Sequence, residues 1–139
     1  MQFSVARYDG LSHADLSRWR EHARAVDPFE SPLLQPEYSR ALMQVRPDLE
    51  IGVARRDGAV VGVFPFHRVA PTRALPSGAD VTDLHAILVE KGTRIDEVAW
   101  LRAMRLERFD FNHLIGPISR RYVFAHDPCY RIRLDQPIP

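Results

Sequence analysis

The chain has 139 residues, 45% of them hydrophobic, so it is long enough for one domain with a buried core. Its 19 basic and 18 acidic residues nearly cancel, which gives no indication of a nucleic-acid-binding surface. A single cysteine, Cys129, excludes an internal disulfide and a cysteine-rich zinc site. We therefore expect a cytoplasmic protein, and the lack of a leader-like or membrane-length apolar stretch predicts no membrane insertion.

The alternation and spacing of apolar residues predict eight main elements. In chain order they are a strand at 2–8, helices at 13–26 and 36–45, strands at 49–56, 59–69 and 84–90, a helix at 96–106 and a strand at 108–115. Two further short strands are expected at 122–124 and 130–134. The stretch 70–83 holds two prolines and no apolar periodicity, which predicts a long loop.

Local signals mark the starts of the first two helices. Ser12 offers a side-chain oxygen as N-cap, and Asp15 follows three residues later, where an acid complements the helix dipole. Pro36 suits the first position of the second helix, because its missing N–H is not needed there. We expect the proline-rich stretch before it to be extended and stiff.

The centre of the chain predicts a tight β-hairpin around Asp57-Gly58, because a two-residue turn needs positive φ and glycine adopts it without strain. Pairing outward from this turn sets Ile51 opposite Phe64. One face is then expected to form the core and the other to be only partly covered. The expected core face consists of Leu49, Ile51, Val53, Val60, Phe64 and Phe66. Pro65 cannot donate to a ladder, so its strand should be at an edge, bulged or unpaired there.

The order of these elements resembles the first part of a GNAT-type acyltransferase fold, and several short motifs resemble the N-terminal half of the CelD/BcsL family. The motifs are Asp27-Pro28-Phe29 with Ser31-Pro32, Gly62-Val63-Phe64-Pro65-Phe66, the loop with Pro76, Gly78 and Thr82-Asp83, and the closing strand near Tyr130. That family comprises FemAB-like, double-GNAT acyltransferases associated with bacterial polysaccharide production. The resemblance implies an α/β (α+β) fold, with a mixed, mostly antiparallel sheet flanked by helices. It places one GNAT-like domain at 1–134 and a linker-like tail at 135–139.

The resemblance also implies an acyl-CoA-dependent enzyme longer than this chain. A C-terminal GNAT domain is expected to bind acetyl-CoA or another acyl-CoA and to be the partner of this domain, and a homodimer is also possible. A CoA-binding turn carries Q/R-x-x-G-x-G/A, so that backbone N–H groups hold the pyrophosphate. The corresponding turn, 89–96, has one glycine and an acid, Glu90, so we expect no cofactor to bind this domain alone.

Three functions follow as hypotheses. The first is a domain that shapes the acceptor site of an acyltransferase and has no turnover alone. The second is a non-catalytic binding or scaffold domain that kept the fold. The third is a small self-sufficient acyltransferase with a degenerate CoA loop, which acetyl-CoA binding by the isolated chain would favour.

Two pairs of residues are candidates for chemistry. Asp83 and His85 would share a strand face, with His85 as general base for an acceptor amine or hydroxyl. Alternatively, Asp83 caps the loop and His85 is a satisfied polar residue. His67 and Arg68 would bind an anionic or sugar acceptor, unless they form a solvated strand end. No metal site is expected, because the polar residues at 110–113 alternate between strand faces.

Overall fold

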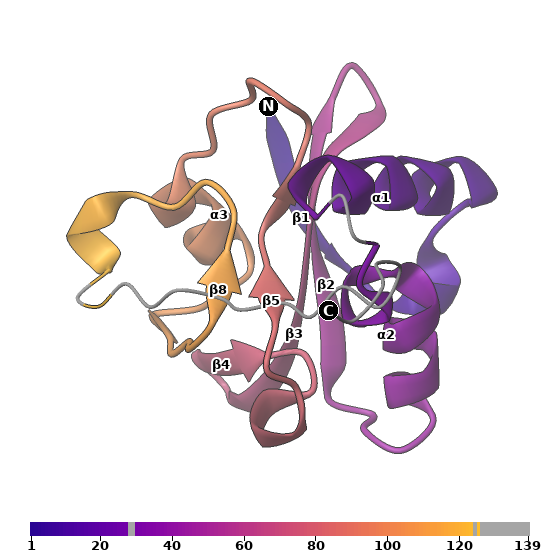
Figure 1. Cartoon of the computed structure of the whole chain (residues 1–139). Coiled ribbons are helices and arrows are strands. Elements are labelled where there is room, and N and C mark those ends of the chain that lie inside the picture. Colours follow the sequence, from indigo (N-terminus) through magenta and orange to yellow (C-terminus); the bar gives the residue numbers. More distant parts are fainter. Residues whose placement is uncertain (28–29, 124, 126–139) are drawn as a thin grey trace, which may run out of the picture.

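The computed structural model describes residues 1–27, 30–123 and 125. Figure 1 shows a central sheet with helices on both sides. The helices are α1 (His13–Val26), α2 (Pro36–Met43) and α3 (Glu97–Ala103). The strands are β1 (Gln2–Ala6), β2 (Leu49–Arg56), β3 (Ala59–Ala70), β4 (Arg73–Pro76), β5 (His85–Ala86), β6 (Leu88–Val89), β7 (Arg108–Phe109) and β8 (Leu114–Ile115). Short 3-10 turns lie at Tyr8–Gly10 (η1), Pro32–Leu34 (η2), Ala79–Val81 (η3) and Arg120–Tyr122 (η4).

The main sheet has the strand order β1-β2-β3-β4-β7, and β6 also pairs with β3. Its neighbours are antiparallel except for β4 and β7, which are parallel, as are β5 and β8 in a separate small sheet. α1 and α2 lie on one side of the main sheet and α3 lies on the other (Figure 1). The predicted class, a mixed and mostly antiparallel sheet flanked by helices, is confirmed.

The hairpin has the predicted turn but not the predicted register. Asp57 and Gly58 both have positive φ, 52° and 81°, as a tight two-residue turn requires. A β-bulge then shifts the pairing between Arg55 and Ala54, so that Ile51 lies opposite Pro65 and Phe64 lies opposite Gly52. Because one extra residue moves the later side chains of β3 to the other face, the predicted core face is wrong for Phe64 and Phe66. It is confirmed for Ile51, Val53 and Val60, which share one buried cluster.

Both faces of the hairpin are buried, each in its own hydrophobic cluster, so the expectation of a half-covered sheet is wrong. The cluster on the α1 side holds Trp19, Ile51, Val53, Val60 and Val63. The cluster on the α3 side holds Ala54, Val61, Phe64, Phe66, Trp100 and Met104. The Trp19 indole N–H donates to the Leu34 carbonyl across 2.9 Å, which fixes α1 against η2.

Pro65 lies where the second neighbour of β3 changes. β6 pairs with β3 at Gly62 and Val63, whereas β4 pairs with it from Phe66 onward. On that side Pro65 therefore has no ladder partner among the described strands, which confirms the prediction that pairing is released there.

The sequence signals predicted to start the first two helices are confirmed. The Ser12 hydroxyl accepts from the backbone N–H of Asp15 across 3.2 Å, and the Asp15 carboxylate accepts from the backbone N–H of Ser12 across 3.0 Å. These two bonds form a capping box at the start of α1. Pro36 occupies the first position of α2, as predicted.

Four predicted stretches differ from the structure. The expected loop at 70–83 contains β4 and η3, because the chain turns back to pair with the end of β3. The strands expected at 84–90 and 108–115 are each divided in two. Tyr122 belongs to η4 and not to a strand. The Pro28-Phe29 motif, Cys129, the strand at 130–134 and the tail at 135–139 lie outside the described residues.

Candidate functional site

A groove lies at the carboxyl ends of β6 and β8. Here the turn after β6, the residue Pro117 after β8, and Ala25 and Val26 at the end of α1 enclose a volume of about 350 Å³. We call this hollow the strand-end groove. Lys91 and Arg94 line it and are exposed.

The turn beside this groove is closed by its own side chains. The backbone N–H of Thr93 donates to the Glu90 carbonyl across 2.9 Å, and the Thr93 hydroxyl donates to the Glu90 carboxylate across 3.3 Å. Arg56 forms an ion pair with that carboxylate at 3.2 Å. The turn is therefore occupied by a carboxylate that Thr93 and Arg56 hold in place.

The first turn of α3 is also occupied by acids. The Asp96 carboxylate accepts from the backbone N–H of Ala99 across 2.9 Å, and the next residue is Glu97. Backbone amides that hold a pyrophosphate must be free and must not face carboxylates. The residues of this turn therefore do not fit a CoA pyrophosphate held in the manner of a glycine-rich loop.

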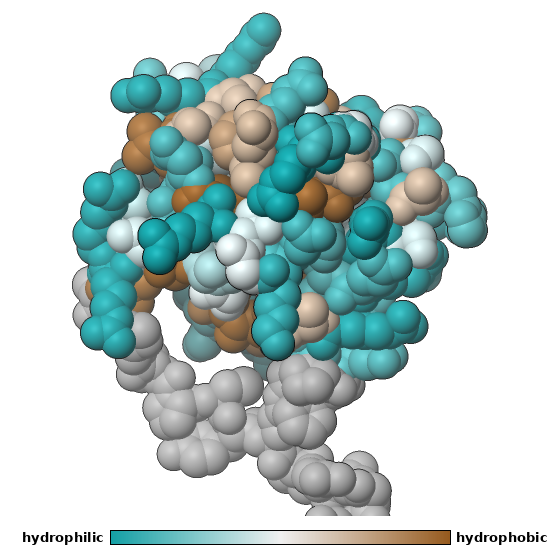
Figure 2. Space-filling view, turned by 90° about the horizontal axis from the view of Figure 1, so that it is seen from above, coloured by the Kyte–Doolittle hydropathy of each residue, from teal (hydrophilic) through white to brown (hydrophobic). Residues whose placement is uncertain are grey.

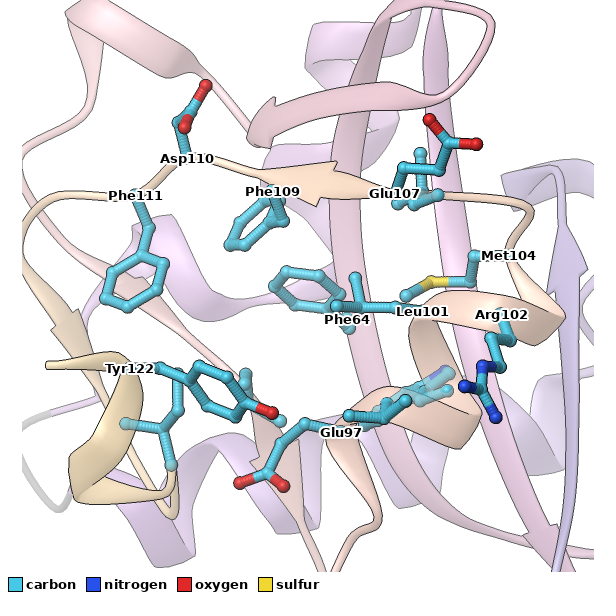
Figure 3. A pocket seen from close by; sticks show the side chains of 15 residues that line it. Phe64, Glu97, Leu101, Arg102, Met104, Glu107, Phe109, Asp110, Phe111 and Tyr122 are labelled. Carbon is cyan, nitrogen blue, oxygen red and sulfur yellow. The ribbon is translucent and has the colours of Figure 1, made fainter.

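A second hollow, of about 690 Å³, lies on the α3 side of the sheet. We call it the aromatic cavity. Figure 3 shows the rings of Phe64, Phe109 and Phe111 gathered together within it. Residues of β3, α3, β7 and η4 contribute to its wall, together with Ile87 and Ile118. No residue of the wall is shared with the strand-end groove.

Asp83 and His85, the predicted catalytic pair, differ in their exposure to solvent. β5 begins at His85, which is 4% exposed, whereas Asp83 lies before the strand and is exposed. The prediction that the two share a strand face is therefore wrong. Both ring nitrogens of His85 lack a hydrogen-bond partner among the described residues. Burial lowers the pKa of His85, and the neighbouring His113 lowers it further.

His67 is fully buried between the hairpin and the loop after β4. The backbone N–H of Gly78 donates to Nε2 of His67 across 3.0 Å. Nδ1 lies 3.4 Å from the carboxylate of Asp48, which itself pairs with Arg46. Burial lowers the pKa of His67. This geometry favours a structural role, and substrate binding by His67 stays a prediction.

Arg68 uses its guanidinium within the fold. It binds the Glu50 carboxylate at 2.6 Å, and it also donates to the carbonyls of Met104 at 2.8 Å and Pro71 at 3.0 Å. These bonds tie β2 and β3 to the end of α3. A substrate anion would have to displace Glu50, so the predicted binding role of Arg68 has little support and stays a prediction.

Two features escaped the sequence patterns. His22, on α1, is 4% exposed, and its Nε2 lies 3.1 Å from the Val60 carbonyl. Its spacing from Trp19 and Val26 on one helix face could have indicated this. The aromatic cavity joins residues far apart in the chain, and nothing in the local pattern marks it. Within 1–27, 30–123 and 125 we find no cluster of three or more potential metal ligands.

No protein-family model and no curated protein matches the chain. Among solved structures, a ribosomal-protein-alanine N-acetyltransferase from Brucella melitensis biovar Abortus 2308 is similar, with a TM-score of 0.49 and 18% identity over 96% of this chain and 100% of that one. AAC(6')-Iy in complex with the bisubstrate analog CoA-S-monomethyl-acetylneamine is also similar, with a TM-score of 0.49 and 14% identity over 96% and 99%. Both neighbours are GNAT acetyltransferases. Such distant likeness says nothing about the chemistry of this chain. In the described part of the chain, no helix has the length and apolar character needed to cross a membrane.

Proposed function

We propose that this chain is a GNAT-like domain of an acyl-CoA-dependent acyltransferase, and that it shapes the acceptor side of the site without holding the CoA pyrophosphate itself. The order of elements around α3 and the strand-end groove support the first part. The second part rests on one observation. Asp96 caps α3 and Glu97 follows it, where a pyrophosphate would need free amides.

A second GNAT domain of the same enzyme is the proposed partner and the proposed holder of acyl-CoA. In that arrangement the exposed Lys91 and Arg94 lie beside the groove, where they would attract the phosphates of a CoA held by the partner. A role of the CelD/BcsL type, in bacterial polysaccharide production in the cytoplasm, is the finer form of this proposal.

A transfer assay tests this function. The isolated chain is incubated with acetyl-CoA and a panel of amines and sugars, and release of the CoA thiol is followed. We expect no release above the buffer rate, and release when a CoA-binding GNAT domain that associates with this chain is added. Turnover by the chain alone contradicts the proposal and supports a self-sufficient acyltransferase.

A non-catalytic binding domain is the second candidate. The aromatic cavity favours it, because its volume of about 690 Å³ lies within the range of roughly 300–1,000 Å³ typical of ligand sites. If the transfer assay stays negative with every added GNAT domain, this alternative becomes the better description.

A further inference from the structure

The loop between β4 and β5 is held to the rest of the fold by two polar contacts. Before η3, the backbone N–H of Gly78 donates to Nε2 of His67, on β3, across 3.0 Å. After η3, the hydroxyl of Thr82 is hydrogen-bonded to that of Tyr38, on α2. Gly78 has a φ of 81°, and a Cβ there would lie 2.7 Å from the Tyr38 hydroxyl. A glycine at this position therefore lets the loop lie close enough for both contacts.

The contact with His67 exists only while this ring is neutral. Nε2 accepts from Gly78, so the one proton of the neutral ring is on Nδ1, which faces the Asp48 carboxylate at 3.4 Å. A second proton can bind only at Nε2, where it would point at the N–H of Gly78. Protonation of His67 and its bond with Gly78 are therefore mutually exclusive.

The surroundings of His67 oppose its protonation while the loop is closed. Burial lowers the pKa of His67, Asp48 raises it, and Arg46, which binds Asp48 at 2.8 Å, lowers it. The strand neighbours of His67, Leu49 on β2 and Leu75 on β4, carry no charge. A protonated ring in this fully buried position would have no acceptor at Nε2, so the proton binds when the loop moves away and water reaches the ring.

The same loop covers a second histidine. His85 is 4% exposed and lies with Ser77 beside a small hollow. Burial and the charge of His113 lower the pKa of His85, whereas Asp83 and the backbone of Thr82 raise it. When the loop moves away, burial no longer opposes protonation of His85, so acid favours the released loop further.

We propose that residues 77–82 form a pH-sensitive latch, which leaves His67 in mild acid while the main sheet stays folded. The latch does not depend on the proposed acyl transfer, because it lies away from the strand-end groove. η3 precedes β5 and the turn of the groove follows β6, and Figure 1 shows η3 at the lower end of these strands. Figure 2 views the molecule from the opposite end, where hydrophilic side chains predominate.

Amide hydrogen exchange of the whole chain tests the latch, read by NMR at each residue between pH 7 and 5 and corrected for the intrinsic exchange rate. The amide of Gly78 should exchange at least about tenfold faster than those of Ile51 and Val53 in β2. Its protection should fall by roughly tenfold or more from pH 7 to 5. His67→Gln offers an acceptor that does not titrate, so the fall should be about tenfold smaller. His13→Gln, the same change at an exposed position, should leave it unaltered.

The charges beside His67 give a second test, in which the direction of the effect is predicted. Asp48→Asn should move the fall in Gly78 protection to lower pH, and Arg46→Gln should move it to higher pH. If His67→Gln fails to fold, these two variants still decide.

Four results overturn the proposal. They are a Gly78 amide that exchanges only as slowly as those of β2, a protection that does not fall in acid, a His67→Gln variant with an unchanged fall, and charge variants that do not shift the fall in opposite directions.

Discussion

The backbone N–H of Gly78 donates to Nε2 of His67 across 3.0 Å, in a fully buried position. Because Nε2 accepts, the neutral imidazole carries its proton on Nδ1, toward Asp48 at 3.4 Å. The ring thus joins the end of the hairpin to the loop after β4.

His67→Ala should therefore lower the free energy of unfolding by about 2–4 kcal/mol, because it leaves a cavity and an unpaired N–H. Urea denaturation followed by circular dichroism measures the change. His13→Ala, on the exposed side of α1, is the control and should change it by less than about 0.5 kcal/mol. If His67→Ala leaves the free energy of unfolding unchanged, the structural role is contradicted and the predicted role in substrate binding gains support.

Two of the buried histidines, His67 and His85, predict that stability falls in mild acid. Burial lowers the pKa of both His67 and His85 from the ordinary value of 6.5. The unfolded chain then binds a proton more readily than the fold, so the free energy of unfolding should decrease as pH falls below 6.5. Urea titrations at a series of pH values check this, and His85→Leu should reduce the slope. The negative charge of the exposed Asp83 favours protonated His85 and so raises its pKa against the effect of burial. Asp83→Asn should therefore make the free energy of unfolding fall more steeply with decreasing pH.

The pair Asp15 and Arg55 predicts a second loss of stability at lower pH. Two hydrogen bonds of 2.7 and 3.0 Å from Arg55 lower the pKa of Asp15 from 3.8 to about 2. The pair stabilises the fold above pH 4 and this contribution is lost as pH falls from about 4 to 2. Asp15→Asn should cost about 1–2 kcal/mol at pH 7 and little at pH 2. Glu21→Asn, in an exposed pair with Arg18, is the control, and an equal cost at both pH values for Asp15→Asn would contradict the account.

Gly52 permits the close approach of α3 to the sheet. A Cβ there would lie 2.5 Å from Sδ of Met104 and 3.0 Å from Nε1 of Trp100. Gly52→Ala should therefore cost about 1–3 kcal/mol and disturb the wall of the aromatic cavity. Gly10→Ala is the matched control, because nothing lies within 4 Å of its Cβ. Thermal unfolding measures both variants, and equal melting temperatures would show that α3 packs more loosely than the structure indicates.

The parts of the fold set by neighbours in sequence could be predicted. Ser12 with Asp15, Pro36 and the turn at Asp57-Gly58 each act within four residues, and all three are confirmed. The bulge beside Arg55 could not be predicted, because both registers bury apolar residues and the choice depends on how α1 and α3 cover the two faces.

The candidate sites depend on contacts between distant residues, so sequence reasoning reached them only in part. The acid in the turn at Glu90 was visible in the sequence. The burial of His85 and the engagement of Arg68 with Glu50, 18 positions away, were not. The aromatic cavity likewise needs β3, α3 and η4 to be placed first.

The central claim is that the turn at 89–96 does not hold the CoA pyrophosphate, and calorimetric titration of the folded chain with acetyl-CoA tests it most directly. We predict no saturable heat up to millimolar acetyl-CoA, because Glu90, Asp96 and Glu97 occupy the turn and the start of α3. Saturable binding that is lost in Lys91→Ala or Arg94→Ala would contradict the account and identify the strand-end groove as a cofactor site of this chain.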